Sequence, residues 1–123
     1  MPKNILLVDD DRMSVELVKR KLQEQGYEIR SAGNGAEALE LLKSKIPDLI
    51  VLDVHMPDMD GYAFIMERNK TPQYTKIPVV MVTAAKETGP LFKRHGVKAY
   101  LIKPIQMQEL LDTVNKIVGP ANA

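Results

Sequence analysis

A chain of 123 residues has the length of one domain and is long enough to bury a hydrophobic core. Its 45% hydrophobic and 27% charged residues are typical of a globular protein, and the net charge of +1 argues against a strongly basic nucleic-acid-binding protein. The absence of cysteine excludes disulfides, thiol catalysis and cysteine-bound zinc. We expect a single domain over residues 1–123, with residues 119–123 as a loose tail and no direct binding to nucleic acid.

The N-terminal segment MPKNILLVDDD places four consecutive apolar residues before three carboxylates. A signal peptide needs an apolar core of about 7–15 residues, and a membrane-spanning helix needs about 20. The segment is too short for either role. We therefore expect a cytoplasmic protein that does not enter a membrane.

Short apolar runs alternate with amphipathic segments five times along the chain. In the first half, apolar runs predict strands and a 3.6-residue periodicity predicts helices. The predicted elements are a strand at 5–8, a helix at 12–25 ended by Gly26, a strand at 27–31, a helix at 34–45 and a strand at 49–52. The last of these strands is the most apolar, so we expect it in the centre of a sheet, covered on both faces.

The second half continues the alternation. The predicted elements are a helix at 60–69, a strand at 77–82, a short helix near 91–95, a strand at 99–102 and a final helix with the apolar stripe Met107, Leu110, Leu111, Val114 and Ile117. The segment between Thr83 and Lys103 is short and contains Gly89-Pro90. We therefore expect the fourth helix to be short or irregular.

Strands that alternate with helices indicate parallel pairing, with right-handed crossovers and helices on both faces of the sheet. The sequence therefore predicts an α/β fold with a doubly wound, five-stranded parallel sheet. In such sheets ligands bind beyond the carboxyl ends of the strands, where the strand order reverses. The residues at these ends are the first candidates for a functional site.

Polar residues stand at the ends of four predicted strands. Asp9 and Asp10 follow the first strand, Asp53 the third, Thr83 the fourth and Lys103 the fifth. Two unit charges about 5 Å apart repel by roughly 3 kcal/mol at an effective dielectric constant near 20, so three clustered carboxylates require cations. Lys103 supplies one positive charge, and Mg²⁺, which binds carboxylates together with water or phosphate oxygens, is the expected second cation. Mn²⁺ is an expected substitute.

Four short motifs surround these residues. They are Leu7-Val8-Asp9-Asp10, Asp53 followed by Met56-Pro57 and Met59-Asp60-Gly61, Thr83-Ala84, and Tyr100-Leu101-Ile102-Lys103-Pro104. Each motif alone is a weak signal, but their order and their positions at strand ends are specific in combination. Over nearly the whole chain the sequence resembles the receiver domain of two-component response regulators. The resemblance implies a flavodoxin-like (βα)5 fold with strand order 2-1-3-4-5.

The resemblance also implies a signalling switch rather than a turnover enzyme. Asp53 corresponds to the phosphoacceptor, a carboxylate nucleophile that forms an aspartyl phosphate. The implied donor is a histidine kinase or a phosphotransfer protein, and the domain would assist its own phosphorylation and dephosphorylation. An output protein would read the altered surface. The sequence does not identify the donor, the output protein or the pathway.

The remaining site residues receive roles from the same resemblance. Asp10 would bind Mg²⁺ directly, and Asp9 directly or through water. Asp53 and the backbone carbonyl of His55 would complete the protein ligands. Lys103 and the metal would neutralise charge on the phosphoryl oxygens during in-line transfer.

Thr83 and Tyr100 are implied as the switch. Thr83 would bond a phosphoryl oxygen, and Tyr100 would move inward after it, which would change the surface of the fifth strand and its flanking helices. The Lys103-Pro104 peptide is expected to be cis. From the residues alone, a tyrosine on an edge strand also fits a packing role without a function.

Two other functional classes share some of these sequence features. A phosphohydrolase of the haloacid dehalogenase type also uses a strand-end aspartate with Mg²⁺, and Asp9-x-Asp11 matches its D-x-D signature. However, Met13 stands where that family has Thr or Val, and there is no cap-domain insertion. Asp11 is instead expected as a helix N-cap. A flavodoxin-like cofactor binder would need a phosphate loop rich in glycine and hydroxyl groups after the first strand, which this sequence lacks.

Two positions depart from the common pattern of the family. His55, two residues after Asp53, is bulky and titratable, whereas Ala85, two residues after Thr83, is small. The resemblance implies that these positions influence how easily water reaches the acyl phosphate. The lifetime of the phosphorylated form therefore stays open.

Overall fold

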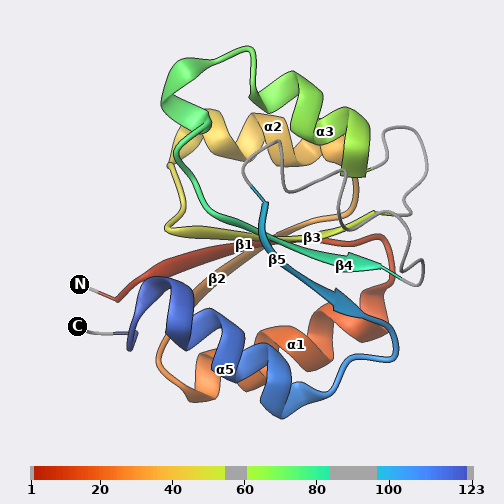
Figure 1. The fold of residues 1–123 in the computed structure, drawn as a ribbon, viewed down its shortest axis with the longest axis vertical. Helices are drawn as coiled ribbons and strands as arrows, with labels where there is room; N and C mark the ends of the chain where they lie inside the picture. Colours follow the sequence, from red (N-terminus) through yellow and green to blue (C-terminus); the bar gives the residue numbers. More distant parts are fainter. Residues whose placement is uncertain (1, 55–60, 84–96, 122–123) are drawn as a thin grey trace.

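A computed structural model describes residues 2–54, 61–83 and 97–121, which contain a five-stranded parallel sheet (Figure 1). The strand order is β2-β1-β3-β4-β5, which confirms the expected topology. The strands are β1 (Asn4–Val8), β2 (Glu28–Ala32), β3 (Leu49–Asp53), β4 (Val79–Thr83) and β5 (Val97–Ile102). The helices are α1 (Arg12–Glu24), α2 (Gly35–Ser44), α3 (Gly61–Arg68), the 3-10 helix η1 (Pro72–Tyr74) and α5 (Met107–Val118). The helix expected near 91–95 lies outside the described residues.

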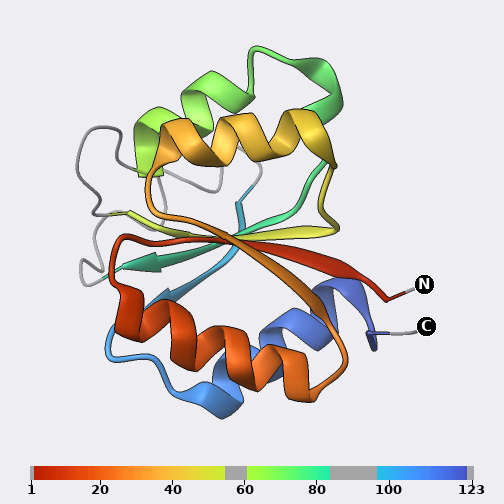
Figure 2. The ribbon, with the colours of Figure 1, turned by 180° about the vertical axis from the view of Figure 1, so that it is seen from behind.

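Helices cover both faces of the sheet (Figures 1 and 2). The helices α2 and α3 lie on one face, and α1 and α5 lie on the other. The apolar core under α2 and α3 includes Leu6, Leu42, Leu52, Phe64 and Met81. The core under α1 and α5 includes Leu7, Leu22, Val51, Leu110 and Val114. In the described part of the chain, no helix has the length and apolar character needed to cross a membrane.

The central strand β3 carries the candidate site. It pairs with β1 on one side and with β4 on the other. Every residue of these three strands is buried. A strand with helices on both of its faces has no solvent-facing side, which explains the continuous apolar runs in the sequence. Asp53 is the polar residue at the end of the buried strand β3.

The first two helices begin at side-chain caps. Asp11 accepts hydrogen bonds from the backbone N–H groups of Met13 and Ser14 at 3.0 and 3.4 Å, which confirms it as an N-cap. Asn34 accepts one from the N–H of Glu37 at 2.8 Å. Such caps contribute about 0.5–2 kcal/mol each to stability. The first helix ends at Glu24, two residues before Gly26.

The connection from α3 to β4 differs from the expectation, because the strand begins at Val79 and not at residue 77. The guanidinium of Arg68, which is fully buried, donates to the carbonyls of Tyr74 and Ile77 at 3.0 and 2.6 Å. Pro78 follows and has no N–H to donate to a strand ladder. The carbonyl of Ile77 is therefore bonded to a side chain, and regular pairing starts after Pro78.

The C-terminal segment is packed, so the expectation of a loose tail is wrong for residues 119–121. Ala121 is buried, and its carbonyl accepts a hydrogen bond from the N–H of Lys3 at 2.7 Å. The ammonium of Lys3 donates to the carbonyl of Val118. The hydroxyl of Tyr27 donates to the carbonyl of Gly119 at 2.8 Å. The two ends of the chain therefore lie side by side (Figure 1). Tertiary contacts order a segment whose composition suggested a tail.

Candidate functional site

The candidate site lies at the edge of the sheet where β1, β3, β4 and β5 end. Asp9 and Asp10 follow β1, Asp53 ends β3, Thr83 ends β4 and Lys103 follows β5. Asp53 and Thr83 are buried, Asp9 and Lys103 are half-buried, and Asp10 is exposed. Parallel pairing thus brings residues from four distant parts of the chain to one edge.

Three carboxylates form a cluster at this edge. Asp9, Asp10 and Asp53 each offer one oxygen, and these oxygens all lie within 4.8 Å of one another. The cluster depends on the pairing of β1 with β3, which places the β1–α1 turn beside the end of β3. Carboxylate oxygens are the ligands that Mg²⁺ prefers, so these residues fit the expected metal. The remaining expected ligand, the backbone carbonyl of His55, lies outside the described residues.

Lys103 is a cation in direct contact with the cluster. Its Nζ lies 3.1 Å from Oδ2 of Asp53, and its backbone N–H donates to the carbonyl of Thr83 at 2.9 Å. Burial by itself would lower the pKa of Lys103, but the hydrogen bond and charge of Asp53, together with the other nearby carboxylates, raise it overall. The lysine is therefore charged at neutral pH. The Lys103-Pro104 peptide is cis, as expected.

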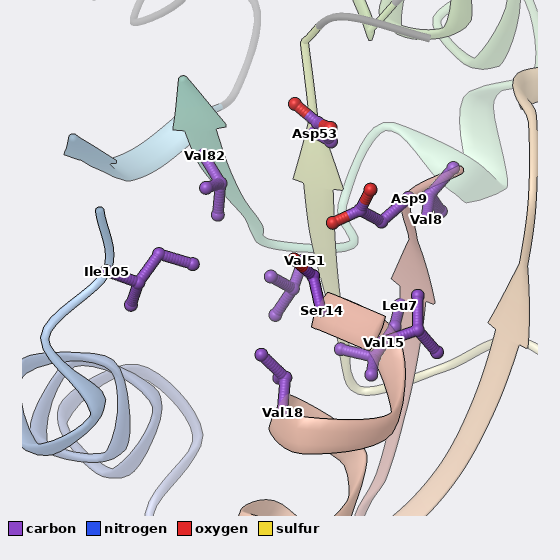
Figure 3. A pocket seen from close by; sticks show the side chains of 10 residues that line it. All are labelled: Leu7, Val8, Asp9, Ser14, Val15, Val18, Val51, Asp53, Val82 and Ile105. Atoms are coloured by element: carbon purple, nitrogen blue, oxygen red, sulfur yellow. The ribbon is translucent and has the colours of Figure 1, made fainter. Parts of the chain in front are cut away.

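The charge of Asp9 is disfavoured in the metal-free protein. Its pKa is raised from the ordinary value of 3.8 to about 6, first by burial and then by the charge and hydrogen bonding of Asp53. The backbone N–H of Asp11 and the charge of Lys103 act in the opposite direction. Figure 3 shows Asp9 and Asp53 at one end of a small pocket whose other walls are mainly aliphatic side chains. A bound divalent cation would offset the repulsion between these carboxylates.

This shift predicts how the stability of the metal-free protein depends on pH. Because folded Asp9 has a pKa of about 6 rather than 3.8, the folded state binds its proton more tightly than the unfolded state. The contribution of Asp9 to the free energy of unfolding should be highest below pH 4 and should fall as the pH rises through 6. Since the side chain is half exposed, we expect a loss of about 1–2 kcal/mol.

Urea denaturation between pH 4 and pH 7.5 in chelator measures this loss. Asp9→Asn should remove it and be more stable than the wild type at neutral pH, and saturating Mg²⁺ should restore wild-type stability. Parallel pH profiles for the wild type and Asp9→Asn would contradict the assignment of the shift to Asp9.

Thr83 and Tyr100 lie on the same face of the sheet. In the β4–β5 pair, Met81 is opposite Tyr100 and Thr83 is opposite Ile102. Side chains two residues apart on a strand share a face. Met81 and the half-buried Tyr100 both pack in the core under α2 and α3. The side chain of Thr83 therefore lies on the same face as that of Met81, two residues closer to the carboxyl end of β4.

Two contacts at the site were not predicted from the sequence. The backbone N–H of Asp11 donates to Oδ1 of Asp9 at 2.9 Å. The N–H of Gly61 donates to the carbonyl of Val54 at 2.8 Å, and a Cβ at Gly61 would lie 2.9 Å from the carbonyl oxygen of Asp53. The helix α3 therefore begins against the backbone of the candidate phosphoacceptor. The Met59-Asp60-Gly61 motif marks this position in the sequence without revealing the contact.

Comparison with known proteins places this chain in a family. The sequence pattern of the family described as "Response regulator receiver domain" matches residues 5–115, which include all the candidate site residues. The chain belongs to this family. Receiver domains are signalling domains, and the fold and the strand-end residues described above fit a phosphoacceptor switch. The comparisons give no support to a phosphohydrolase of the haloacid dehalogenase type.

Curated relatives and solved structures agree with this placement. The chain is 31% identical to the polar-differentiation response regulator DivK of Brucella anthropi, over 98% of this chain and 100% of that protein. The chemotaxis response regulator CheY4 of Vibrio cholerae is 32% identical with a TM-score of 0.89, over 95% of this chain and 99% of that one. The receiver domain of the sensor histidine kinase PA1611 from Pseudomonas aeruginosa is 25% identical with a TM-score of 0.86, over 97% and 99% of the two chains. That structure has a magnesium ion coordinated in its active site cleft.

The positions that bear on the lifetime of an acyl phosphate, His55 and Ala85, lie outside the described residues. The same holds for residues 84–96, which contain the expected fourth helix and Gly89-Pro90. The expectations for these positions stay predictions from the sequence.

Proposed function

We propose that Asp53 accepts a phosphoryl group in a Mg²⁺-dependent reaction and that residues 1–123 form one receiver domain. The observation that carries the proposal is a buried carboxylate with Lys103 at 3.1 Å and two further carboxylates with oxygens within 4.8 Å. This arrangement combines a nucleophile, a fixed cation and oxygen ligands for a divalent metal at the end of a central strand. The proposed donor is a histidine kinase or a phosphotransfer protein, and the proposed location is the cytoplasm.

In the proposed reaction, one oxygen of Asp53 attacks the phosphorus atom in line with the leaving group. The new O–P bond forms as the N–P bond of a phosphohistidine breaks, and the electron pair passes to the imidazole nitrogen. Lys103 holds a phosphoryl oxygen and balances part of its charge. Asp9, Asp10, Asp53 and the carbonyl of His55 would hold Mg²⁺, which when bound supplies further positive charge at the phosphoryl oxygens.

The same residues support hydrolysis when water attacks the aspartyl phosphate. The domain would thus contribute to its own phosphorylation and dephosphorylation, without turning over an external substrate. Because the chemistry resides in the receiver, a small acyl phosphate can replace the protein donor. Mn²⁺, which also accepts oxygen ligands, is a proposed substitute for Mg²⁺.

Incubation with acetyl phosphate tests the proposed function. With Mg²⁺ present, intact-protein mass spectrometry should show one added phosphoryl group, and a chelator should prevent its addition. A generic phosphomonoester should not be turned over under the same conditions. Phosphorylation that is equally fast in chelator would contradict the metal-dependent mechanism, and sustained monoester turnover would contradict the signalling role.

We further propose that Thr83 and Tyr100 transmit the phosphorylation state. The phosphoryl group replaces roughly one negative charge with two and adds acceptor oxygens near the end of β4. Thr83 would move toward these oxygens, and Tyr100, on the same face of the neighbouring strand, would fill the vacated space. Such coupling is typically worth about 1–3 kcal/mol, whereas a shift from 1:99 to 99:1 needs roughly 5.5 kcal/mol. The unphosphorylated domain should therefore already sample the active form.

Thr83→Ala should keep phosphorylation but uncouple it from the surface of β5. NMR spectra with and without a beryllofluoride phosphate mimic should show large shift changes near Tyr100 in the wild type and small ones in Thr83→Ala. Thr113→Ala on α5 is the matched control and should behave like the wild type. Identical changes near Tyr100 in the wild type and Thr83→Ala would contradict the switch mechanism while leaving the phosphoacceptor assignment intact.

A further inference from the structure

The turn between β1 and α1 connects a helix cap to the carboxylate cluster. The backbone N–H of Asp11 donates to Oδ1 of Asp9 at 2.9 Å. Asp9 is half-buried and has an oxygen within 4.8 Å of oxygens of Asp10 and Asp53. Because these carboxylates repel one another, a fixed donor stabilises both the charge of Asp9 and the orientation of its side chain.

The side chain of Asp11 determines where this N–H lies. Its Oδ1 accepts hydrogen bonds from the N–H groups of Met13 and Ser14 at 3.0 and 3.4 Å, and its Oδ2 accepts one from the hydroxyl of Ser14 at 3.1 Å. Both oxygens are therefore engaged with the first turn of α1. The carboxylate cluster found among the described residues does not include Asp11.

These contacts form a chain from the helix to the metal site. The first turn of α1 donates hydrogen bonds to the Asp11 carboxylate, which fixes the backbone of Asp11. The backbone N–H of Asp11 in turn donates to the carboxylate of Asp9. Without the cap, the turn would be free to move its N–H away from Asp9, and repulsion from Asp53 would favour rotation of the Asp9 carboxylate out of the cluster. Partners that orient metal ligands in this way typically change metal affinity by about 10–100-fold when they are removed.

We propose that Asp11 is a positioning residue for Mg²⁺ binding, acting through its backbone N–H on the Asp9 carboxylate and not as a ligand. The proposal rests on the proposed function, because it takes Asp9 as part of the metal site. It goes beyond that function by assigning a role to the third aspartate of the Asp9-Asp10-Asp11 run. The negative charge of Asp11 is a separate influence on the site, since it also helps to raise the pKa of Lys103.

Calorimetric titration with Mg²⁺ at about 0.15 M salt, where exposed charges are screened, tests this role. Asp11→Ala should raise the dissociation constant about 10-fold. Asp11→Ser and Asp11→Asn, which retain an N-cap oxygen but lack the charge, should stay within about 2-fold of the wild type. Asp11→Gly should cost little helix stability, because glycine is tolerated at an N-cap. It should still weaken Mg²⁺ binding as much as Asp11→Ala does, because it has no side chain to anchor the turn.

Asn34→Ala is the matched control. Asn34 caps α2 through a 2.8 Å hydrogen bond from the N–H of Glu37, and its amide side chain offers no carboxylate oxygen to a metal. Its loss should destabilise the fold as Asp11→Ala does, yet leave the Mg²⁺ dissociation constant unchanged. In the metal-free protein, the amide proton of Asp11 should exchange slowly in the wild type and in Asp11→Asn, and faster in Asp11→Ala and Asp11→Gly.

Three results would overturn the proposal. Unchanged Mg²⁺ affinity in Asp11→Gly would show that the cap does not position Asp9. An equal loss in Asp11→Asn and Asp11→Ala would assign the effect to charge or direct ligation. An equal loss in Asn34→Ala would assign it to general destabilisation. Failure of the proposed function looks different, because Asp10→Ala would then leave Mg²⁺ affinity unchanged or the wild type itself would not bind Mg²⁺.

Discussion

Asp53→Asn is expected to reduce phosphorylation by acetyl phosphate by at least about 10³-fold, because asparagine lacks the anionic oxygen that attacks phosphorus. The two side chains have nearly the same size, so the buried end of β3 should keep its packing. The substitution also removes one of three clustered carboxylates and thereby relieves repulsion on Asp9, while the amide oxygen of asparagine can still accept a hydrogen bond from Lys103. We therefore expect the metal-free variant to be at least as stable as the wild type. Intact-protein mass spectrometry and thermal denaturation measure the two effects.

Asp112→Asn is the control for this experiment. Asp112 is an exposed carboxylate on α5 whose side chain accepts a hydrogen bond from Gln108 at 2.8 Å. Its replacement should leave the extent of phosphorylation unchanged. A phosphoryl group that appears to the same extent on Asp53→Asn as on the wild type would show that another residue is the acceptor.

Lys103→Met is expected to lower the rate of phosphorylation by about 10²–10³-fold, the usual effect of removing one fixed donor from a developing oxyanion. The ammonium lies 3.1 Å from Oδ2 of Asp53 and is well placed to hold a transferred phosphoryl oxygen. Removing this cation leaves the carboxylate cluster more negative. The affinity for Mg²⁺ should therefore increase while the rate falls, and this opposite response separates the role of Lys103 from general damage to the site.

Single-turnover kinetics at saturating Mg²⁺ and calorimetric titration measure these two responses. Lys98→Met is the matched control, because Lys98 is an exposed lysine on the same strand, β5. It should change neither quantity. A rate for Lys103→Met within about 3-fold of the wild type would remove Lys103 from the transfer step.

Much of the site can be placed from the sequence because parallel topology brings strand ends together. Once alternating strands and helices are recognised, Asp9, Asp53 and Lys103 must lie at the carboxyl edge of one sheet. The apolar run before Asp53 also places its strand in the centre, since only a strand covered on both faces lacks polar residues. These features follow from the order of the elements and from the burial of the strands, and both can be read from the sequence pattern.

Other features depend on tertiary contacts that no local pattern records. The buried Arg68 donates to the carbonyl of Ile77, and β4 begins only at Val79. An arginine near a helix end usually indicates a solvated position instead. The order of the C-terminal segment depends on Lys3 and Tyr27, which are distant in the chain. The contact between the N–H of Asp11 and Asp9 depends on the geometry of one turn. Residue types alone do not specify such pairings.

The most direct test of the central claim is to locate the phosphoryl group by its chemistry. Reduction of an aspartyl phosphate with borohydride converts that residue to homoserine, which tandem mass spectrometry identifies by position. After treatment with acetyl phosphate and Mg²⁺, we predict homoserine at position 53 and none at positions 9, 10 or 11. Homoserine at any of these three positions, with Asp53 unmodified, would contradict the assignment of Asp53 as the phosphoacceptor.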